Sequence, residues 1–327
     1  MSRTKQRARR GGKPIGKRSL GEDGSERPTK QQKHDPDGTP NDEVSSTSQQ
    51  VSSGAPAIFI SGAASGLGRS LVMAYAKLIQ TEPPAPLTKA SRIYALDMPG
   101  KCTPSKIEKL FGFTPDDVDW MMTHVVPMSC NIQDGNRLER IVSEIPDDIA
   151  LAIHSVGIRG LVPGLPVNKY SDVAEAENLE VMTSKTMAHT FQINTIGTFL
   201  ALRALLPALK KHIITNGTNP EAPPPKVVVM GSRMGSIGHN TSQGGAYAYR
   251  ASKAALNAVV KSFSVDVPEV VYTIVHPGRV ESKLVPIKED DAIPVETAVA
   301  DLVPLIQSLG KSDTGRFLDR FGADIVW

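Results

Sequence analysis

Cysteine and long apolar runs are scarce in this sequence of 327 residues. The two cysteines, Cys102 and Cys130, belong to no paired metal-ligand spacing, and the seven histidines are scattered along the chain. We therefore expect neither a disulfide scaffold nor a metal site. No apolar stretch is long enough to cross a bilayer, and no apolar signal segment opens the chain. The sequence thus predicts a cytoplasmic protein without a membrane span.

Large apolar residues are nearly absent from residues 1–54, which are rich in Lys, Arg, Gly, Ser, Gln and Pro. Such a segment cannot build a core, so we expect a disordered basic tail. Through Lys33 the chain carries 11 basic and three acidic residues, which leaves 26 basic and 31 acidic residues for the rest. Besides a solvated extension, this excess of positive charge fits nuclear import or a loose contact with nucleic acid or acidic lipid.

Residues 55–327 alternate between short apolar runs and helical patterns, which predicts a single α/β domain. The expected fold is a Rossmann-type, doubly wound parallel sheet of about seven strands. Two insertions interrupt the alternation, KCTPSKIEKLFGFTPDDVDWMM and LVPGLPVNKYSDVAEAENLEVM, and we expect the second to border the substrate mouth. The strands are expected to begin near Ala57, Arg92, His124, Ile149, Lys226, Val270 and Arg316.

A glycine turn, SGAASGLGR, follows the first expected strand and precedes a helical pattern. A dinucleotide-binding turn needs glycine where the backbone approaches a pyrophosphate and where helix packs closely on strand. Gly62, Gly66 and Gly68 supply those places, with a spacing one residue longer than the common fingerprint. The candidate cofactor-binding residues of this turn are Ser61, Gly62, Ser65, Gly66, Leu67 and Gly68.

Asp97 ends the second expected strand, roughly thirty residues beyond the glycine turn. A carboxylate at this position accepts hydrogen bonds from the ribose hydroxyls of a dinucleotide and repels an additional phosphate. Ser65, rather than a basic residue, stands just before Gly66. These residues favour NAD(H), while NADP(H) remains the alternative because Arg69 follows the turn; as the first helix residue beyond it, Arg69 is expected to face solvent.

Tyr249 and Lys253 lie one helical turn apart in AYRASKAAL, which places both on one helix face. A phenol has a pKa of about 10 and is a poor base at neutral pH unless nearby cations stabilise the phenolate. The pair therefore predicts an acid/base group with its activating ammonium. The alternative is an amphipathic helix with a core tyrosine and a solvated lysine.

Together these motifs resemble the short-chain dehydrogenase/reductase family, most closely its carbonyl-reductase branch. The resemblance runs from about Ala57 to Trp327 and rests on motifs in the family's order. They are SGAASGLG, FQINTIGTFLALRALLPAL with the family's structural Asn at Asn194, KVVVMGSRMGSI with its active-site serine, YRASK, IVHPGRVES and GRFLDRFGADIVW.

The resemblance implies further cofactor-binding residues, and one of the segments departs from the family's pattern. HSVG replaces the usual Asn-Asn-Ala-Gly, so Ser155 would have to make the hydrogen bonds of the missing asparagine side chains. His154 and His276 are interpreted as packing or turn residues. An active-site serine is implied at Ser232 or Ser236, of which the strand end favours Ser232. The remaining implied cofactor-binding residues are Asn131, Ser155, Gly157, Pro277, Gly278, Val280 and Ser282, with Tyr249 and Lys253.

The predicted function is hydride transfer between a nicotinamide cofactor and a carbonyl or alcohol substrate of small size. Tyr249 would transfer the proton, Lys253 would lower the pKa of the Tyr249 phenol, and Ser232 would hold the substrate oxygen. Asn194 would position a water that joins Lys253 to solvent, as the resemblance implies. The family's habit of pairing through the helices of Asn194 and Tyr249 implies a homodimer or homotetramer. The alternative, suggested by HSVG and the charged tail, is a noncatalytic dinucleotide-responsive binding or regulatory protein.

Overall fold

The computed structural model describes residues 54–103, 106–111, 115–165, 167, 173–216, 222–242, 244–287 and 289–327. They belong to one compact unit, Gln49–Trp327. Except for Gly54, the predicted basic tail lies outside the described residues, and so do the nuclear-import and nucleic-acid interpretations of it. No helix in the described part of the chain is long and apolar enough to span a membrane.

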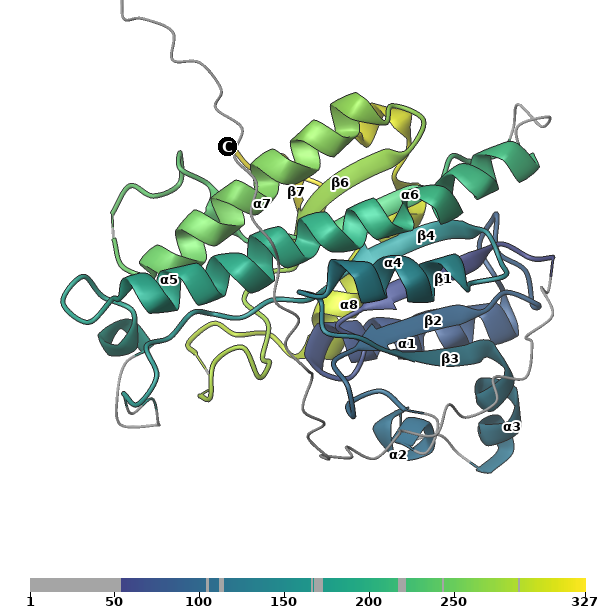
Figure 1. Ribbon diagram of the computed structural model, residues 1–327, viewed down its shortest axis with the longest axis horizontal. Coiled ribbons are helices and arrows are strands. Elements are labelled where there is room, and N and C mark those ends of the chain that lie inside the picture. The colour runs from purple at the N-terminus through teal and green to yellow at the C-terminus, as the bar shows by residue number, and fades with distance from the viewer. Residues whose placement is uncertain are drawn as a thin grey trace, which may run out of the picture. The chain divides into compact units, whose positions relative to one another are not determined.

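A parallel sheet of seven strands forms the centre of this unit (Figure 1). Its strand order is β3-β2-β1-β4-β5-β6-β7, and each strand begins within one residue of the predicted position. The predicted doubly wound fold is thereby confirmed. The strands are β1 (Ala57–Ser61), β2 (Ile93–Asp97), β3 (Val125–Ser129), β4 (Ile149–His154), β5 (Lys226–Met230), β6 (Val271–His276) and β7 (Phe317–Asp319).

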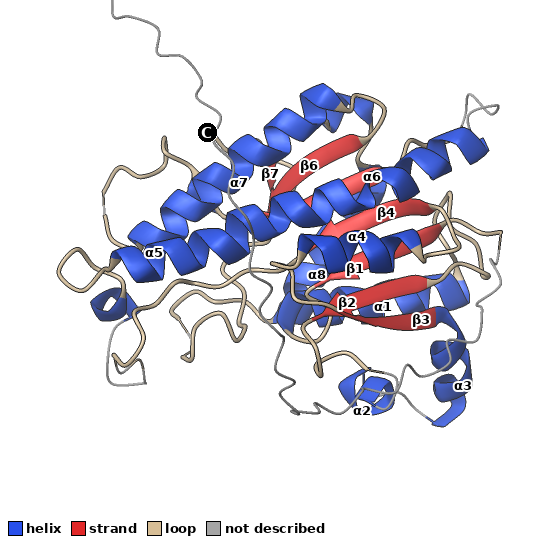
Figure 2. Cartoon of the chain, viewed as in Figure 1, coloured by secondary structure: helices blue, strands red, loops and turns tan. Residues whose placement is uncertain are grey.

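Helices cover both faces of the sheet (Figure 2). One core packs α1 (Gly66–Thr81) and α8 (Val295–Ser308) against it, and the other packs α4 (Gly135–Ser143), α6 (Gly197–Asn216) and α7 (Tyr247–Asp266). The strands are almost continuous apolar runs because both of their faces are buried. The remaining elements are α2 (Ile107–Phe111), α3 (Pro115–His124), η2 (Val173–Ala176), α5 (Ser184–Phe191), η3 (Gln192–Ile196), η4 (Arg233–Gly235) and η5 (Lys311–Asp313).

The strand order reverses beside β1, which pairs with β2 on one side and with β4 on the other. Connections leave this point toward opposite faces, so a crevice opens at the carboxyl ends of the strands. The first insertion forms α2 and α3, and Leu110 of α2 accepts a hydrogen bond from Arg69 in the first turn of α1. The residues that follow the central strands at this edge are Gly62 after β1, Asp97 at the end of β2, Ser155 after β4, Gly231 after β5 and Pro277 after β6.

Candidate active site

A cavity of about 1600 Å³ follows the carboxyl edge of the sheet. Most of the predicted site residues line it, from the glycine turn at one end to Tyr249 at the other. Three of them do not: Ser61, Gly68 and Asn194 are buried behind its wall. The predicted residues that line the cavity are Gly62, Ser65, Gly66, Leu67, Asp97, Asn131, Ser155, Gly157, Ser232, Tyr249, Lys253, Pro277, Gly278, Val280 and Ser282.

The glycine turn has the backbone shape that its sequence predicts. Gly62 and Gly66 adopt φ of 78° and 48°, in the left-handed region that favours glycine. Gly68 packs so closely that an added Cβ would lie 2.1 Å from the Gly62 carbonyl oxygen. Ser65 caps α1, yet its side chain makes no capping hydrogen bond. The unpaired N–H groups of the first helical turn and the Ser65 hydroxyl therefore fit the pyrophosphate of a dinucleotide.

Asp97 lies at the end of β2, directly beside this turn. Its Oδ2 accepts from the Ala64 backbone N–H at 2.8 Å, and its Oδ1 accepts from Met98 N–H at 2.7 Å. A carboxylate oxygen has a second lone pair, so Asp97 can still accept from a ribose hydroxyl. Arg69 does not line the cavity, and contrary to expectation it is half-buried, with its Nε donating to the carbonyl of Leu110.

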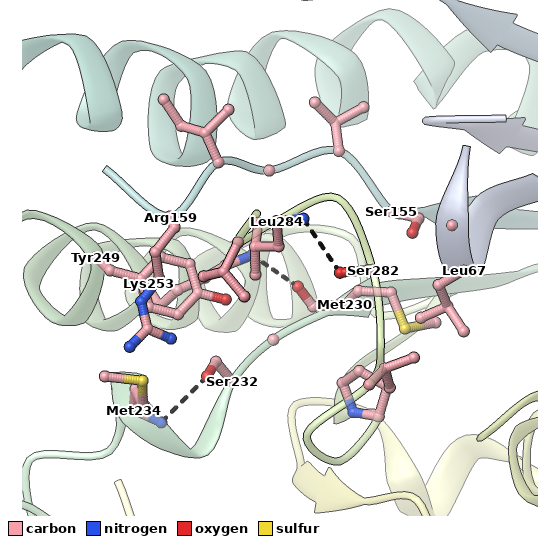
Figure 3. A pocket seen from close by; sticks show the side chains of 18 of the residues that line it. Leu67, Ser155, Arg159, Met230, Ser232, Met234, Tyr249, Lys253, Ser282 and Leu284 are labelled. Atoms are coloured by element: carbon pink, nitrogen blue, oxygen red, sulfur yellow. Dashed lines mark hydrogen bonds between the residues drawn. The ribbon is translucent and has the colours of Figure 1, made fainter. Parts of the chain in front are cut away.

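Tyr249, Lys253 and Ser232 meet at the far end of the cavity (Figure 3). All three are buried. Lys253 Nζ donates to the Met230 carbonyl at 2.9 Å and lies 5.9 Å from the centre of the Tyr249 ring. The Ser232 oxygen accepts from Met234 N–H at 3.2 Å, which leaves its own O–H to donate. The chain thus brings a phenol, an ammonium and a hydroxyl donor to one place.

Burial and charge act on the phenol in opposite directions. Loss of solvent raises the pKa of Tyr249, while the guanidinium of Arg159 and a hydrogen bond with Ser232 lower it. Burial also lowers the pKa of Lys253, to about 8. Near neutral pH the ammonium therefore keeps its proton, but by a small margin.

Asn194 lies in η3 and is fully buried. Its Oδ1 accepts from Ile158 N–H at 2.8 Å, and its Nδ2 donates to the Ile158 carbonyl at 2.9 Å and to Ser252 Oγ at 3.0 Å. It therefore fixes the segment that follows Gly157. A Cβ added to Gly157 would lie 3.4 Å from Asn194 Oδ1 and 3.5 Å from Lys253 Nζ, so glycine keeps the space between these two side chains open.

His154, the first residue of HSVG, joins three elements at the sheet centre, where the resemblance implied a role for Ser155. The His154 ring joins Ser61 Oγ, 2.8 Å from Nδ1, to Thr198 Oγ1, 3.0 Å from Nε2. The end of β4 is thereby tied to β1 and α6 at the sheet centre. The side chain of Ser155 lines the cavity instead, and its backbone N–H donates to the Ser61 carbonyl. His154 is buried, as expected for a packing residue.

The two candidate serines occupy different environments. Ser236 does not line the cavity, and its hydroxyl donates to the Val326 carbonyl near the last residue of the chain. Ser232 lines the cavity together with Tyr249, and its side chain lowers the pKa of that phenol. This geometry favours Ser232 as the hydroxyl that meets a substrate.

Arg159 and Glu177 line the same cavity and were not foreseen from the sequence. Their carboxylate and guanidinium form an ion pair with an N–O distance of 2.7 Å. Glu177 belongs to the second insertion, which does border the cavity, through Val173, Ala174, Glu177 and Asn178 rather than through Leu161, Val162 or Leu165. The available signal was an arginine in the apolar segment after β4, where an unpaired charge would be costly.

The short chain dehydrogenase family model matches residues 118–292. The chain belongs to the short-chain dehydrogenase family. Two curated relatives are "C-signal" of Myxococcus xanthus, 34% identical over 181 residues (55% of this chain, 93% of that protein), and 1-hydroxy-2-glutathionyl-2-methyl-3-butene dehydrogenase of Rhodococcus sp. (strain AD45), 35% identical over 140 residues (42% and 56%). The resemblance inferred from the motifs is thereby confirmed.

Solved carbonyl reductases share this fold. The carbonyl reductase Sniffer of D. melanogaster superposes with a TM-score of 0.64 and 25% identity over 84% of this chain and all of that one. The NADPH-bound carbonyl reductase from chicken fatty liver superposes with a TM-score of 0.64 and 23% identity, over 84% of this chain and 94% of that one. Family membership and these neighbours identify the chain as an NAD(P)-dependent oxidoreductase acting on carbonyl or alcohol groups.

Proposed function

We propose that the enzyme interconverts a small carbonyl compound and its alcohol with Tyr249 as acid/base, and that it prefers NAD(H). One observation carries the proposal. The phenol of Tyr249, the ammonium of Lys253 and the hydroxyl of Ser232 lie together in a cavity whose other end holds the glycine turn and Asp97. A dinucleotide held by the glycine turn and Asp97 would extend along this edge toward the phenol.

The nicotinamide supplies or takes the hydride when it is bound. In the reductive direction negative charge builds on the substrate oxygen, and Tyr249 gives that oxygen its proton. Ser232 donates a hydrogen bond to the same oxygen and holds it in place. Lys253 stabilises the resulting phenolate through its positive charge. Asn194 keeps the wall at Ile158 rigid, and we assign to it the water that joins Lys253 to solvent.

Asp97 and Arg69 are the basis of the NAD(H) preference. Asp97 would repel a phosphate on the adenosine ribose, whereas Arg69 is already engaged with the Leu110 carbonyl outside the cavity. Against this preference, solved neighbours include a carbonyl reductase with NADPH and a short-chain dehydrogenase/reductase from Burkholderia multivorans with NADP. Asn131 and Ser155 would border the adenosine half, and Pro277, Gly278, Val280 and Ser282 would close over the nicotinamide half.

We also propose a homodimer or homotetramer that pairs through α6 and α7, and a cytoplasmic location. Exposed apolar side chains on these helices support the pairing, among them Phe199, Ile214 and Val265. A pairing through the two helices would cover these side chains. The HSVG departure does not favour the noncatalytic alternative, because His154 joins Ser61 to Thr198 outside the cavity and leaves the cavity lining intact.

The test of the proposed function is the Tyr249→Phe variant. Purified protein is assayed with NADH and NADPH against aldehydes and ketones and with NAD⁺ and NADP⁺ against alcohols, and cofactor binding is followed by the fluorescence of the reduced nicotinamide. We expect the variant to bind cofactor like the wild type and to lose turnover by a factor of about 10² to 10⁴. Undiminished turnover by the variant would overturn the assignment of Tyr249.

A further inference from the structure

Arg159 stands on backbone that is fixed from both sides. On one side the Asn194 amide holds the N–H and the carbonyl of Ile158. On the other side Gly160 has φ of 77°, and a Cβ there would lie 2.5 Å from Thr190 Oγ1 on α5 and 3.1 Å from Ala248 Cβ on α7. The segment is thus wedged between α5 and α7, and only a glycine fits the wedge. The direction of the Arg159 side chain follows from this placement.

Glu177 orients the guanidinium of Arg159. Arg159 Nε donates to Glu177 Oε2 at 2.8 Å, and Nη2 donates to Oε1 at 2.7 Å, which is the two-pronged geometry that fixes an arginine plane. The two side chains are only 11% and 7% exposed. Held in this way, the guanidinium carbon lies 5.1 Å from the centre of the Tyr249 ring, nearer than Lys253 Nζ at 5.9 Å. Figure 3 shows Arg159 beside Tyr249 in the cavity.

The same glutamate also holds the start of the helix that carries Tyr249. The Glu177 carbonyl accepts from the Ala246 N–H at 2.8 Å. Ala246 precedes α7 and adopts a φ of 48°, which is uncommon for a residue with a side chain. One residue of the second insertion therefore contacts both the guanidinium and the entry to α7.

We propose that Arg159, oriented by Glu177, is a positioning residue that holds the Tyr249 ring and stabilises its phenolate during the reaction. The proposal rests on the proposed function of Tyr249. A phenol buried this deeply resists ionisation, and a nearby cation in a poorly solvated site offsets that resistance. The ammonium of Lys253 donates a hydrogen bond to the Met230 carbonyl, so Lys253 provides only part of the stabilisation of the phenolate. A second cation adds to that stabilisation. The direction of the Arg159 effect on the Tyr249 pKa agrees, because the guanidinium lowers it.

The experiment compares Arg159→Met and Arg159→Lys with the wild type. Phenolate formation is followed by ultraviolet difference absorbance against pH, and the spectrum of Tyr249→Phe is subtracted to isolate one tyrosine among six. We expect the titration midpoint of Tyr249 to move to higher pH in Arg159→Met. In Arg159→Lys the midpoint should lie between those of the wild type and Arg159→Met. With a turned-over substrate, kcat at pH 7 should fall about tenfold in Arg159→Met, with KM changed less.

Arg203→Met is the matched control. Arg203 forms an ion pair with Glu139 at 2.7 Å and lies 5.5 Å from the centre of the Phe199 ring, so it shares the carboxylate partner and the aromatic neighbour of Arg159. It differs in being about half exposed and in lying outside the cavity that holds Tyr249. Its removal should leave the midpoint unchanged. If Arg159→Met folds poorly because Glu177 is left unpaired, the double variant Arg159→Met, Glu177→Met removes both charges. Glu177 raises the pKa of Tyr249, but by less than Arg159 lowers it, so the midpoint of the double variant should lie above that of the wild type and below that of Arg159→Met.

The outcomes separate this inference from the proposed function. An unchanged midpoint in Arg159→Met or in the double variant overturns the role of Arg159, even if Tyr249→Phe has lost turnover as expected. A midpoint that rises in Arg159→Met and returns part of the way in Arg159→Lys supports it. Because the difference spectrum needs no substrate, it gives this answer even if the wild type reduced no carbonyl of the panel, a result that would overturn the proposed function alone.

Discussion

His154 Nδ1 lies 2.8 Å from the hydroxyl oxygen of Ser61, so the carboxyl ends of β4 and β1 are joined through a buried imidazole. The other ring nitrogen lies 3.0 Å from Thr198 Oγ1 on α6. Burial and the charge of Lys253 lower the pKa of His154 to about 3. The ring therefore remains neutral throughout the physiological range, and its tie between strands and helix does not depend on pH there.

His154 makes the stability of the fold depend on acidity. Histidine in the unfolded chain takes up a proton below about pH 6.5, whereas the native ring takes one up only near pH 3. As pH falls between those values, this group therefore lowers the free energy of unfolding by about 1.4 kcal/mol for each pH unit. We expect His154→Asn to lose about 1–3 kcal/mol at pH 7 through broken hydrogen bonds, and to show a shallower decline toward pH 4.

Urea unfolding at several pH values from 7 to 4 measures both effects. His189→Asn, at an exposed histidine, is the control and should keep the wild-type slope. Equal slopes in His154→Asn and the wild type would contradict a neutral buried ring.

Lys253 is expected to cost stability in exchange for its role at the site. In the unfolded chain a lysine keeps its proton to about pH 10.4, but buried Lys253 gives it up near pH 8. Below pH 8 the native state therefore holds an unfavourable buried charge, and this cost shrinks as pH rises from 8 toward 10.4. Lys253→Met should raise the free energy of unfolding at pH 7 by about 1–3 kcal/mol while turnover is lost.

Denaturant unfolding of Lys253→Met and the wild type at pH 7 and pH 10 checks this expectation. The increase in the free energy of unfolding that Lys253→Met causes should be smaller at pH 10 than at pH 7. A variant that is less stable than the wild type at both pH values would show that the hydrogen bond to the Met230 carbonyl outweighs the burial of charge.

Asp97→Asn tests the cofactor preference while it keeps the hydrogen bond to the glycine turn. The hydrogen bond from the Met98 N–H is lost, because an asparagine side chain has only one acceptor oxygen. An asparagine oxygen can still accept from the Ala64 N–H, but the negative charge is gone. We expect NADPH to bind about tenfold more tightly than to the wild type and NADH to bind less tightly. Fluorescence titration with both cofactors provides the measurement.

Arg69→Met is the companion variant. Since Arg69 lies outside the cavity and donates to the Leu110 carbonyl, its loss should leave NADPH affinity unchanged. A marked loss of NADPH affinity in Arg69→Met would instead make this side chain the phosphate partner and argue against the preference for NAD(H).

Gly68→Ala should disrupt the glycine turn. The new methyl carbon would lie 2.1 Å from the Gly62 carbonyl oxygen, so α1 must move away from β1. We expect a loss of about 1–3 kcal/mol in the free energy of unfolding and a weaker binding of either cofactor. Thermal unfolding and fluorescence titration measure the two effects. Gly310→Ala has open space around the added carbon and should behave like the wild type; similar behaviour of Gly68→Ala would contradict the close packing.

The apolar runs and motifs of the sequence suffice to predict the parallel sheet, its doubly wound topology and the location of the glycine turn. These features depend on short-range patterns: apolar runs of strand length, glycines at fixed spacing, and a tyrosine and a lysine one helical turn apart. Each strand begins where its apolar run begins because a parallel strand between two layers of helices must be apolar throughout. The order of motifs likewise sufficed to identify the family.

Only the tertiary structure decided which polar side chains share the cavity. Arg159 and Glu177 are eighteen residues apart and meet because the two ends of the second insertion lie together, where the Val162 N–H donates to the Ala176 carbonyl. No local pattern encodes this contact. Ser232 and Ser236 have similar local sequence, yet one faces Tyr249 and the other meets Val326 from the far end of the chain. His154 is a histidine at a strand end in the sequence, and it becomes a link between Ser61 and Thr198 only through packing. Such contacts depend on distances between elements, which the three-dimensional fold sets and the spacing of residues along the chain does not.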